Sequence, residues 1–295
     1  MPAELPDAPA LTVVLPCRNG AATLPRQLDA LARQEWARPW ELVFVDNGST
    51  DSSAELAMGS ADRLPVRLVE ATERAGGAYA ANAGARAARA PAVCFCDADD
   101  EVGERWLPAL GDALAVHEFV ACGHDVEALN EPWLRESREP AFAGGLPRLP
   151  FPPFAVHATS SAMGVSRRLF DELGGFDETM DVLYDTDFSV RAHLAGHEIH
   201  FVPEAVVRYR YRDTVGGTFA QARAYARQMA LLQRRYVPAG EHVPGRRTWP
   251  LEGWKPVARA LPRAGTQAGR ARLAWLLGWQ AGRYAGSLRY RVLAV

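Results

Sequence analysis

The sequence predicts an α/β fold in which helices flank a mostly parallel mixed sheet, followed by a C-terminal helical extension. Through the first half of the chain, short apolar runs alternate with stretches whose apolar residues recur at helical spacing. This alternation is typical of parallel sheets covered by helices on both faces. From about residue 218 onward the pattern is helical. We therefore expect one domain at residues 1–240 and a basic helical extension at residues 241–295.

Four apolar runs in the first half have the length and composition of strands buried on both faces. They are LTVVLP at 11–16, ELVFVD at 41–46, VRLVE at 66–70 and AVCFCD at 92–97. Helices are expected from Leu24, within the Ala-rich stretch 75–90 and from Trp106 to Leu114. Open parallel sheets bind ligands beyond the carboxyl ends of their strands, so Asp46 and Asp97 lie at the expected edge of a site.

The second half of the chain is less regular. Residues 126–155 are rich in proline, glycine and charge, and they predict a long loop of the kind that is usually functional. Residues 160–178 predict a strand, a turn and a helix that stops at a Gly-Gly pair. Residues 185–195 predict a helix, and 197–203 and 205–211 predict two short strands.

The composition is that of a folded protein with balanced charge. Lys and Arg number 33 against 35 Asp and Glu, a net charge of −2 that gives no sign of nucleic-acid binding, and we expect no such partner. The four cysteines lack the paired spacing of a zinc site and predict buried thiols in a reducing compartment. We find no signal-peptide pattern and no apolar run of about 20 residues, so a cytoplasmic protein is expected.

The C-terminal stretch is strongly basic, with one acid, Glu252, among ten basic residues that aromatic side chains interrupt. The basic residues are Arg246, Arg247, Lys255, Arg259, Arg263, Arg270, Arg272, Arg283, Arg289 and Arg291. One interpretation is an amphipathic helix on an anionic membrane surface, at the inner face of the membrane. The other is a helix packed on the domain with its basic face in water. Both stay open, and the sequence does not indicate an oligomeric state.

Acidic residues crowd the end of the fourth strand. In CFCDADDEV, Asp97, Asp99, Asp100 and Glu101 follow the apolar run almost without interruption. Neighbouring carboxylates repel one another, so such a cluster either lies at the start of the next helix or forms a binding site for a cation. Two further polar clusters occur, VVLPCRNG with VFVDNGSTD near the start and LGGFDETMDVLYDTDFSVRAHLAG later.

Taken in order, these clusters resemble the motifs of the family 2 inverting glycosyltransferases, which have the GT-A fold and use nucleotide-diphosphate sugars. The matching segments are VVLPCRN (13–19), VDNGSTD (45–51), ANAG (81–84), DADD (97–100), GGFDE (174–178), YDTDFSVR (184–191) and VPEAVV (202–207). Each piece alone is weak evidence, but the ordered set is specific and covers roughly residues 10–235. The resemblance implies a glycosyltransferase that uses a nucleotide-sugar donor and a hydroxyl acceptor.

The resemblance also implies roles for individual residues. Asp97 would serve the ribose and a divalent cation, Mn²⁺ or Mg²⁺, while Asp99 would coordinate that cation directly. Asp46 would hold the nucleobase edge. The remaining residues implied to line the nucleotide pocket are Pro16, Arg18, Asn19 and Asn82.

The resemblance places the general base at Asp185. An acceptor hydroxyl has a high pKa and needs such a base to take its proton, attacking opposite the leaving group so that the anomeric configuration inverts. Taken alone, Asp185 is also a suitable helix cap. Asp187 has the spacing of an i,i+4 pair with Arg191.

Three positions depart from the family pattern. Ala81 stands where an arginine is usual, Tyr184 where a glutamate precedes the base, and Arg208 where many members have a metal-binding histidine. Arginine cannot ligate a cation, but it can pair with a diphosphate directly. We therefore hypothesise a weaker dependence on metal, with Arg208 and Tyr184 as candidate diphosphate or acceptor contacts.

The acceptor is not indicated by the sequence, nor are the donor base and sugar. The 126–155 loop would shape the acceptor site, with Trp133 and His157 as candidate contacts. A non-catalytic nucleotide-sugar binder of the same fold is the main alternative. A sugar-1-phosphate nucleotidyltransferase is disfavoured because LPCRNGAATL has no lysine, and a dinucleotide dehydrogenase because AGGAYAANAG lacks an acidic ribose partner.

Overall fold

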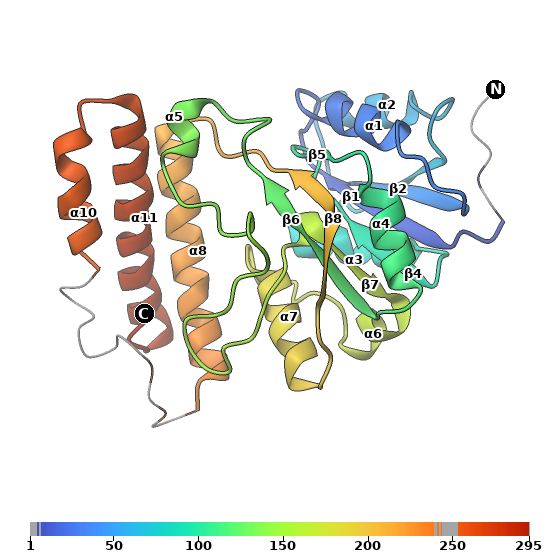
Figure 1. Ribbon diagram of the computed structural model, residues 1–295. Helices are drawn as coiled ribbons and strands as arrows, with labels where there is room; N and C mark the ends of the chain where they lie inside the picture. Colours follow the sequence, from blue (N-terminus) through green and yellow to red (C-terminus); the bar gives the residue numbers. More distant parts are fainter. Residues whose placement is uncertain (1–4, 6, 239–240, 242, 244–252, 295) are drawn as a thin grey trace. The chain divides into compact units, whose positions relative to one another are not determined.

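The computed structural model describes residues 5, 7–238, 241, 243 and 253–294, and the chain divides into two compact units (Figure 1). The first unit comprises Met1–Asp125, Phe142–Pro147 and His157–Tyr209. The second comprises Val126–Ala141, Arg148–Val156 and Arg210–Val295. Each unit is described by itself below.

The described part of the first unit is built on one mixed sheet with the strand order β3-β2-β1-β4-β7-β6-β8-β5. The strands are β1 (Leu11–Cys17), β2 (Trp40–Asp46), β3 (Val66–Glu70), β4 (Ala92–Phe95), β5 (Glu101–Val102), β6 (Phe119–Asp125), β7 (Met163–Ser166) and β8 (His200–Arg208). Strands β3, β2, β1 and β4 run parallel, whereas β7 is antiparallel to both β4 and β6. The four predicted strands and the mixed α/β fold are confirmed.

Helices cover both faces of this sheet. They are α1 (Leu24–Ala32), α2 (Ser53–Met58), α3 (Gly77–Ala87), α4 (Trp106–Leu114), η1 (Ser160–Ala162), α6 (Arg167–Glu172) and α7 (Tyr184–Leu194). Alternate residues of β1 enter different cores, with Val13 and Leu15 on one side and Val14 on the other. Because both faces are covered, the strand reads as a continuous apolar run rather than an alternating one.

Two features of the second half differ from the sequence-based expectation. Residues 197–203 and 205–211 do not form two strands, because a single strand, β8, spans His200–Arg208. Its pairing with β6 shifts register between Ala121 and Gly123, on either side of Pro203 in the partner strand. Proline removes a ladder donor, so the interruption that suggested two strands is an irregularity within one. The expected 126–155 loop also contains a short helix, α5 (Pro132–Arg135).

The second unit consists mainly of helices: α5, α8 (Val215–Tyr236), α10 (Lys255–Ala260), η2 (Leu261–Arg263) and α11 (Gln267–Tyr290). Figure 1 shows α8 and α10 on opposite sides of α11. Helix α8 groups with α11, and the final segment of this unit begins at Arg210. Among the described residues, no helix has the length and apolarity needed to cross a membrane.

Candidate functional site

Side chains connect the loops that follow β1 and β2. The Asn19 carboxamide oxygen accepts the Thr50 backbone N–H at 2.7 Å, and the Asn19 backbone N–H donates to the Ser49 hydroxyl at 3.0 Å. The Asp46 carboxylate accepts the Ser49 N–H at 3.1 Å. Asn19 has a φ of 56°, a left-handed conformation that asparagine tolerates better than most residues. Asn19 and Asp46 thus come together at the carboxyl edge of the sheet, as the sequence predicts.

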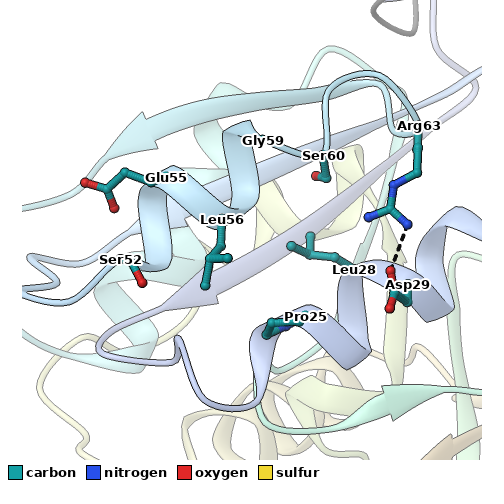
Figure 2. Close-up of a pocket in the computed structure, with 9 residues that line it drawn as sticks. All are labelled: Pro25, Leu28, Asp29, Ser52, Glu55, Leu56, Gly59, Ser60 and Arg63. Atoms are coloured by element: carbon teal, nitrogen blue, oxygen red, sulfur yellow. Dashed lines mark hydrogen bonds and ion pairs between the residues drawn. The ribbon is translucent and has the colours of Figure 1, made fainter.

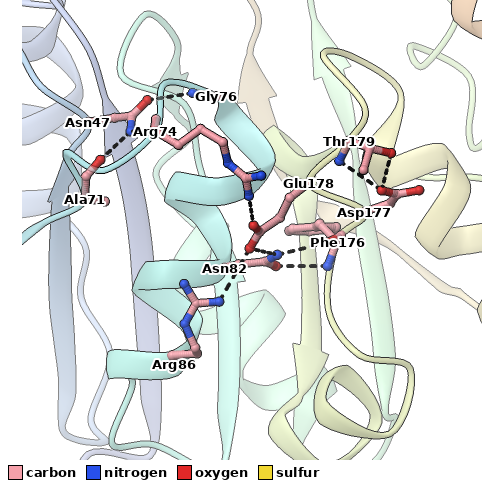
Figure 3. Close-up of polar contacts among 10 residues, drawn as sticks. All are labelled: Asn47, Ala71, Arg74, Gly76, Asn82, Arg86, Phe176, Asp177, Glu178 and Thr179. Atoms are coloured by element: carbon pink, nitrogen blue, oxygen red, sulfur yellow. Dashed lines mark hydrogen bonds and ion pairs between the residues drawn. The ribbon is translucent and has the colours of Figure 1, made fainter.

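Asn47 extends this connection to the loop after β3, as Figure 3 shows. Its amide nitrogen donates to the carbonyls of Ala71 at 2.5 Å and Arg74 at 2.7 Å. Its oxygen accepts the Gly76 N–H at 2.9 Å. Sequence reasoning missed this residue, although the segment VFVDNGSTD that contains it was noted. With Asn47, three successive strand-end loops are held in one arrangement.

The acidic loop after β4 brings three carboxylates together. Oxygens of Asp97, Asp99 and Asp100 lie within 4.8 Å of one another. Asp97 and Asp99 are half-buried and Asp100 is buried. An all-oxygen set of this size suits a hard divalent cation such as Mn²⁺ or Mg²⁺. The residues present therefore fit the implied metal.

Gln27, on α1, fastens the acidic loop through two hydrogen bonds to its backbone. Its amide nitrogen donates to the Asp97 carbonyl at 3.1 Å, and its oxygen accepts the Val102 N–H at 2.9 Å. The side chain is fully buried, so neither backbone group has water as an alternative partner. This residue was also missed, because one glutamine on an otherwise amphipathic helix gives no sequence signal.

Asn82 has a structural role that its predicted nucleotide contact did not include. Its amide nitrogen donates to the Phe176 carbonyl and to the Glu178 carboxylate, each at 2.9 Å, and its oxygen accepts the Phe176 N–H at 2.9 Å (Figure 3). Arg74 and Arg86 also pair with Glu178. Both amide N–H groups are used within the protein, so Asn82 fastens α3 to the 174–178 turn and cannot donate to a nucleotide without breaking that contact.

Asp185 lies in the first turn of α7, two residues after a residue with an unusual backbone conformation. Leu183 caps the helix with a φ of 59°, in the left-handed region that a leucine rarely adopts. The Asp185 carboxylate accepts the backbone N–H groups of Ser160 at 2.8 Å and Thr186 at 2.7 Å. Burial raises the pKa of this carboxyl, and the hydrogen bonds from Ser160 and Thr186 only partly oppose that rise. A raised carboxyl pKa is what a general base working near neutral pH requires.

Strand pairing relates Asp185 to the acidic loop. Strand β4 ends at Phe95, which pairs with Met163, the first residue of the antiparallel strand β7. Asp97 follows Phe95 by two residues, and Ser160, the partner of Asp185, precedes Met163 by three. The register therefore places the carboxylate triad and the contact of Asp185 at the same edge of the sheet.

Tyr184 occupies the space between α7 and the start of α3. Its hydroxyl lies 3.3 Å from the Ser160 hydroxyl, and its ring packs against Phe176. A Cβ on Gly77 would lie 2.9 Å from the Tyr184 oxygen, so a larger residue there would force the tyrosine hydroxyl to shift. Ala81, one turn further along α3, is buried in the core. A charged side chain in its place would be buried and would need a partner of opposite charge.

His157 lies close to Thr186, the residue that follows Asp185. Its ring nitrogen Nδ1 is 3.5 Å from the Thr186 hydroxyl. Burial lowers the pKa of His157 to about 4, and it does the same for His124, whose ring nitrogen contacts the Thr159 hydroxyl at 3.1 Å. Both imidazoles are therefore neutral at pH 7 and contribute no positive charge to the site.

Arg208 ends β8 directly opposite Glu101, the residue that follows the carboxylate triad. The two side chains form an ion pair, and Arg33 approaches the same carboxylate at 3.7 Å. This places Arg208 beside the acidic loop, as expected from its position after the last strand. Its guanidinium is held by Glu101, a partner 107 residues away that no sequence pattern indicates.

The other residues that the sequence analysis singled out lie in several different parts of the structure. Asp187 is buried and pairs with Arg191 at 2.8 Å, which confirms the expected i,i+4 contact. Pro16 pairs with Val45 within the sheet, and Arg18 is exposed on the loop after β1. Trp133 belongs to α5 of the second unit.

A shallow pocket of about 350 Å³ lies elsewhere on the first unit, between α1 and α2 (Figure 2). Pro25, Leu28 and Leu56 give it an apolar floor, and an ion pair between Arg63 and Asp29 at 2.8 Å closes one side. It contains none of the residues that sequence motifs indicate, so we do not assign the chemistry to it.

Comparisons with known proteins agree with this fold. The sequence profile described as Glycosyl transferase family 2 matches residues 12–174. A PGL/p-HBAD biosynthesis glycosyltransferase of Mycobacterium bovis is 32% identical over 188 residues, which is 62% of this chain and 70% of that protein. Validoxylamine A glucosyltransferase of Streptomyces hygroscopicus is 37% identical over 119 residues, 40% of this chain and 28% of that protein.

The structural comparison extends over nearly the whole chain. A mannosyltransferase from Pyrobaculum calidifontis, solved with GDP-mannose and Mn²⁺, superposes with a TM-score of 0.64 at 20% identity, covering 97% of this chain and 89% of that one. The fold is thus an α/β glycosyltransferase fold of the GT-A type. The chain belongs to glycosyl transferase family 2, and it is a glycosyltransferase.

Proposed function

We propose that this glycosyltransferase moves a sugar from a nucleoside-diphosphate donor to an acceptor hydroxyl with inversion at the anomeric carbon. The observation that carries the proposal is a half-buried carboxylate of raised pKa, Asp185, whose partner Ser160 lies on the strand edge that also carries the carboxylate triad. The GDP-mannose and Mn²⁺ in the mannosyltransferase structure support the same combination of donor and metal.

In the proposed reaction Asp185 takes the proton of the acceptor hydroxyl as that oxygen forms its bond to the anomeric carbon. The bond from the anomeric carbon to the diphosphate breaks, and its electron pair stays on the diphosphate. The N–H groups of Ser160 and Thr186 hold the carboxylate in place during proton transfer. Asp99 and Asp97 would hold a divalent cation, which supplies positive charge for the leaving diphosphate.

We further propose that the loop after β2 receives the nucleoside. Asp46 and Asn19 lie on adjacent strand-end loops at the edge where open α/β sheets bind nucleotides. We also propose that Arg208, through its pair with Glu101, offsets part of the negative charge of the acidic loop. Some activity should then survive in EDTA. Complete loss of turnover in chelator contradicts this part of the proposal.

The donor is identified by thermal shift with a panel of nucleoside-diphosphate sugars, each with and without Mn²⁺. A donor that binds only the native state raises the melting temperature, and the account expects that rise to depend on Mn²⁺ and to shrink in Asp99→Asn. Release of nucleoside diphosphate is then measured for wild type and Asp185→Asn. If a donor binds wild type and Asp185→Asn equally and neither protein releases nucleoside diphosphate from it, the chain is a non-catalytic binder. No shift with any donor would overturn the proposal.

A further inference from the structure

Residues 253–294 of the second unit form a basic stretch of the sequence. This stretch holds eight Lys and Arg residues and no Asp or Glu. Arg283 is buried and Arg272 is half-buried, whereas the other six are exposed. The exposed basic residues are Lys255, Arg259, Arg263, Arg270, Arg289 and Arg291. Arg246 and Arg247 of the predicted basic stretch lie outside the described residues.

The same stretch exposes large apolar side chains. Six of the twelve exposed large apolar residues in the described chain lie here: Trp254, Leu261, Leu277, Tyr284, Leu288 and Leu293. The most exposed is Leu288, at 85%. Exposed apolar residues that gather in one region, rather than being scattered singly, indicate an interaction surface.

Leu277, Tyr284 and Leu288 lie on one face of α11. Their spacings of seven and four residues place them within about 40° of one another around the helix. Arg270 precedes Leu277 by seven residues and lies on the same face near the start of the helix, and Arg291, the exposed residue that caps the helix, lies at its other end. We call these five residues the outer face of α11. The Trp254 indole N–H donates to the Tyr284 hydroxyl at 3.0 Å, which adds an aromatic residue beside it.

The outer face is not left over from incomplete packing, because α11 already uses another face against α8. A Cβ on Gly278 would lie 2.4 Å from the Phe219 carbonyl oxygen, and one on Gly282 would lie 2.3 Å from that of Arg223. Such close backbone approach fixes the rotation of α11. Leu277, Tyr284 and Leu288 therefore cannot turn inward to join that interface.

Charge and apolarity together select the partner. An anionic bilayer offers acyl chains for the leucines and negative headgroups for the arginines, and tryptophan and tyrosine favour the boundary between them. A nucleic acid would match the charge but would leave the leucines in water. Because no described helix can cross a membrane, the contact would be made from the surface. We propose that the outer face of α11 docks the enzyme on an anionic bilayer surface.

The test is flotation of the full chain with vesicles of phosphatidylcholine alone and of phosphatidylcholine mixed with phosphatidylglycerol. The protein should bind the mixed vesicles, and salt should weaken the binding. Leu277→Ser with Leu288→Ser should weaken it about tenfold per leucine. Arg270→Gln with Arg291→Gln should weaken it about fivefold per arginine.

Matched controls come from the first unit. Val116→Ser with Leu194→Ser removes two exposed apolar residues there, and Arg26→Gln with Arg38→Gln removes two exposed charges, and both pairs should bind like wild type. Melting curves show whether each variant is folded at the assay temperature, and all of them should be, although Leu277, at 39% exposed, contributes some packing. Equal binding to neutral vesicles, no binding to either kind, or full binding by the leucine variant would overturn the proposal. So would a dimer in size-exclusion chromatography that becomes a monomer in the leucine variant.

Discussion

Within each of the two units of this glycosyltransferase, a different kind of contact holds the segments together. In the first, buried polar side chains fasten loops: Gln27, Asn47 and Asn82 are at most 7% exposed, and each bonds backbone groups of a distant segment. In the second, α11 packs on α8 through Gly278, Gly282 and Gly286, where backbone approaches backbone. The first unit thus depends on hydrogen bonds from buried side chains, and the second on glycines that let two helix backbones approach closely.

This difference indicates where chemistry can be placed. A carboxylate must be held in position to coordinate or to take a proton, and directed hydrogen bonds from buried amides supply that control. Close helix packing instead gives a rigid support whose outer surface is free to vary. We therefore expect the first unit to be sensitive to isosteric changes of polar atoms, and the second to added volume.

The largest effect is expected for Asp185→Asn. Loss of the proposed base should lower turnover about 10³-fold while donor binding persists, and steady-state release of nucleoside diphosphate measures both. Asp181→Asn, an exposed neighbour, is the matched control and should retain activity. Because burial raises the pKa of Asp185, the rate in wild type should fall as the pH drops through a value above the ordinary 3.8. Equal turnover by Asp185→Asn and wild type would contradict the assignment.

Gln27→Leu is expected to be the next most damaging change. It keeps the side-chain volume but leaves the Asp97 carbonyl and the Val102 N–H buried without their partner, which costs about 3 to 5 kcal/mol of unfolding free energy. Urea denaturation measures this loss, and Mn²⁺ affinity should fall with it because the acidic loop is released. A typical single hydrogen bond contributes about 1 kcal/mol to stability. If the unfolding free energy of Gln27→Leu lies within about 1 kcal/mol of the wild-type value, the glutamine does not fasten the loop.

His124→Gln should alter the pH dependence of stability. The folded pKa of His124 is about 4, below its ordinary 6.5, so the folded state binds fewer protons in this range and stability declines as the pH drops from 6.5 toward 4. Glutamine retains a partner for Thr159 but cannot titrate. The variant should lose about 2 to 3 kcal/mol less than wild type between pH 7 and pH 4.5. Identical pH profiles in urea titrations would count against a buried neutral imidazole.

Gly282→Ala tests the second unit. The added methyl would lie 2.3 Å from the Arg223 carbonyl oxygen, and the resulting overpacking should cost about 2 kcal/mol. Gly265→Ala, where nothing lies within 4 Å, is the control and should be neutral. Neither change should alter Mn²⁺ affinity, so a Gly282→Ala variant that folds normally but loses metal would break the contrast between the units.

The sequence predicted those parts of the fold that a local pattern encodes. Continuous apolar runs at 11–16 and 41–46 marked buried strands, and the acids that end such runs marked the edge of the site. The expected division of residues 197–211 into two strands failed because Pro203 interrupts the hydrogen-bond ladder without ending β8. A local proline cannot reveal that a neighbouring strand compensates for it.

The side chains that assemble the site were harder to predict because their partners are remote in sequence. Gln27 meets Asp97 across 70 residues, and Arg208 meets Glu101 across 107. Asn82 was assigned to the nucleotide from its motif, whereas its amide groups bond Phe176 and Glu178. A motif locates a residue at the site but does not say which of its neighbours will use its hydrogen bonds.

The central claim is that the loop carrying Asp97 and Asp99 is the metal and diphosphate site of this enzyme. Its most direct test is anomalous diffraction from crystals of the full chain grown with Mn²⁺ and the nucleoside diphosphate of the identified donor. The account predicts one manganese peak about 2.2 Å from an Asp99 carboxylate oxygen, with the diphosphate on its open side. A bound diphosphate with its manganese away from Asp97 and Asp99 would contradict it.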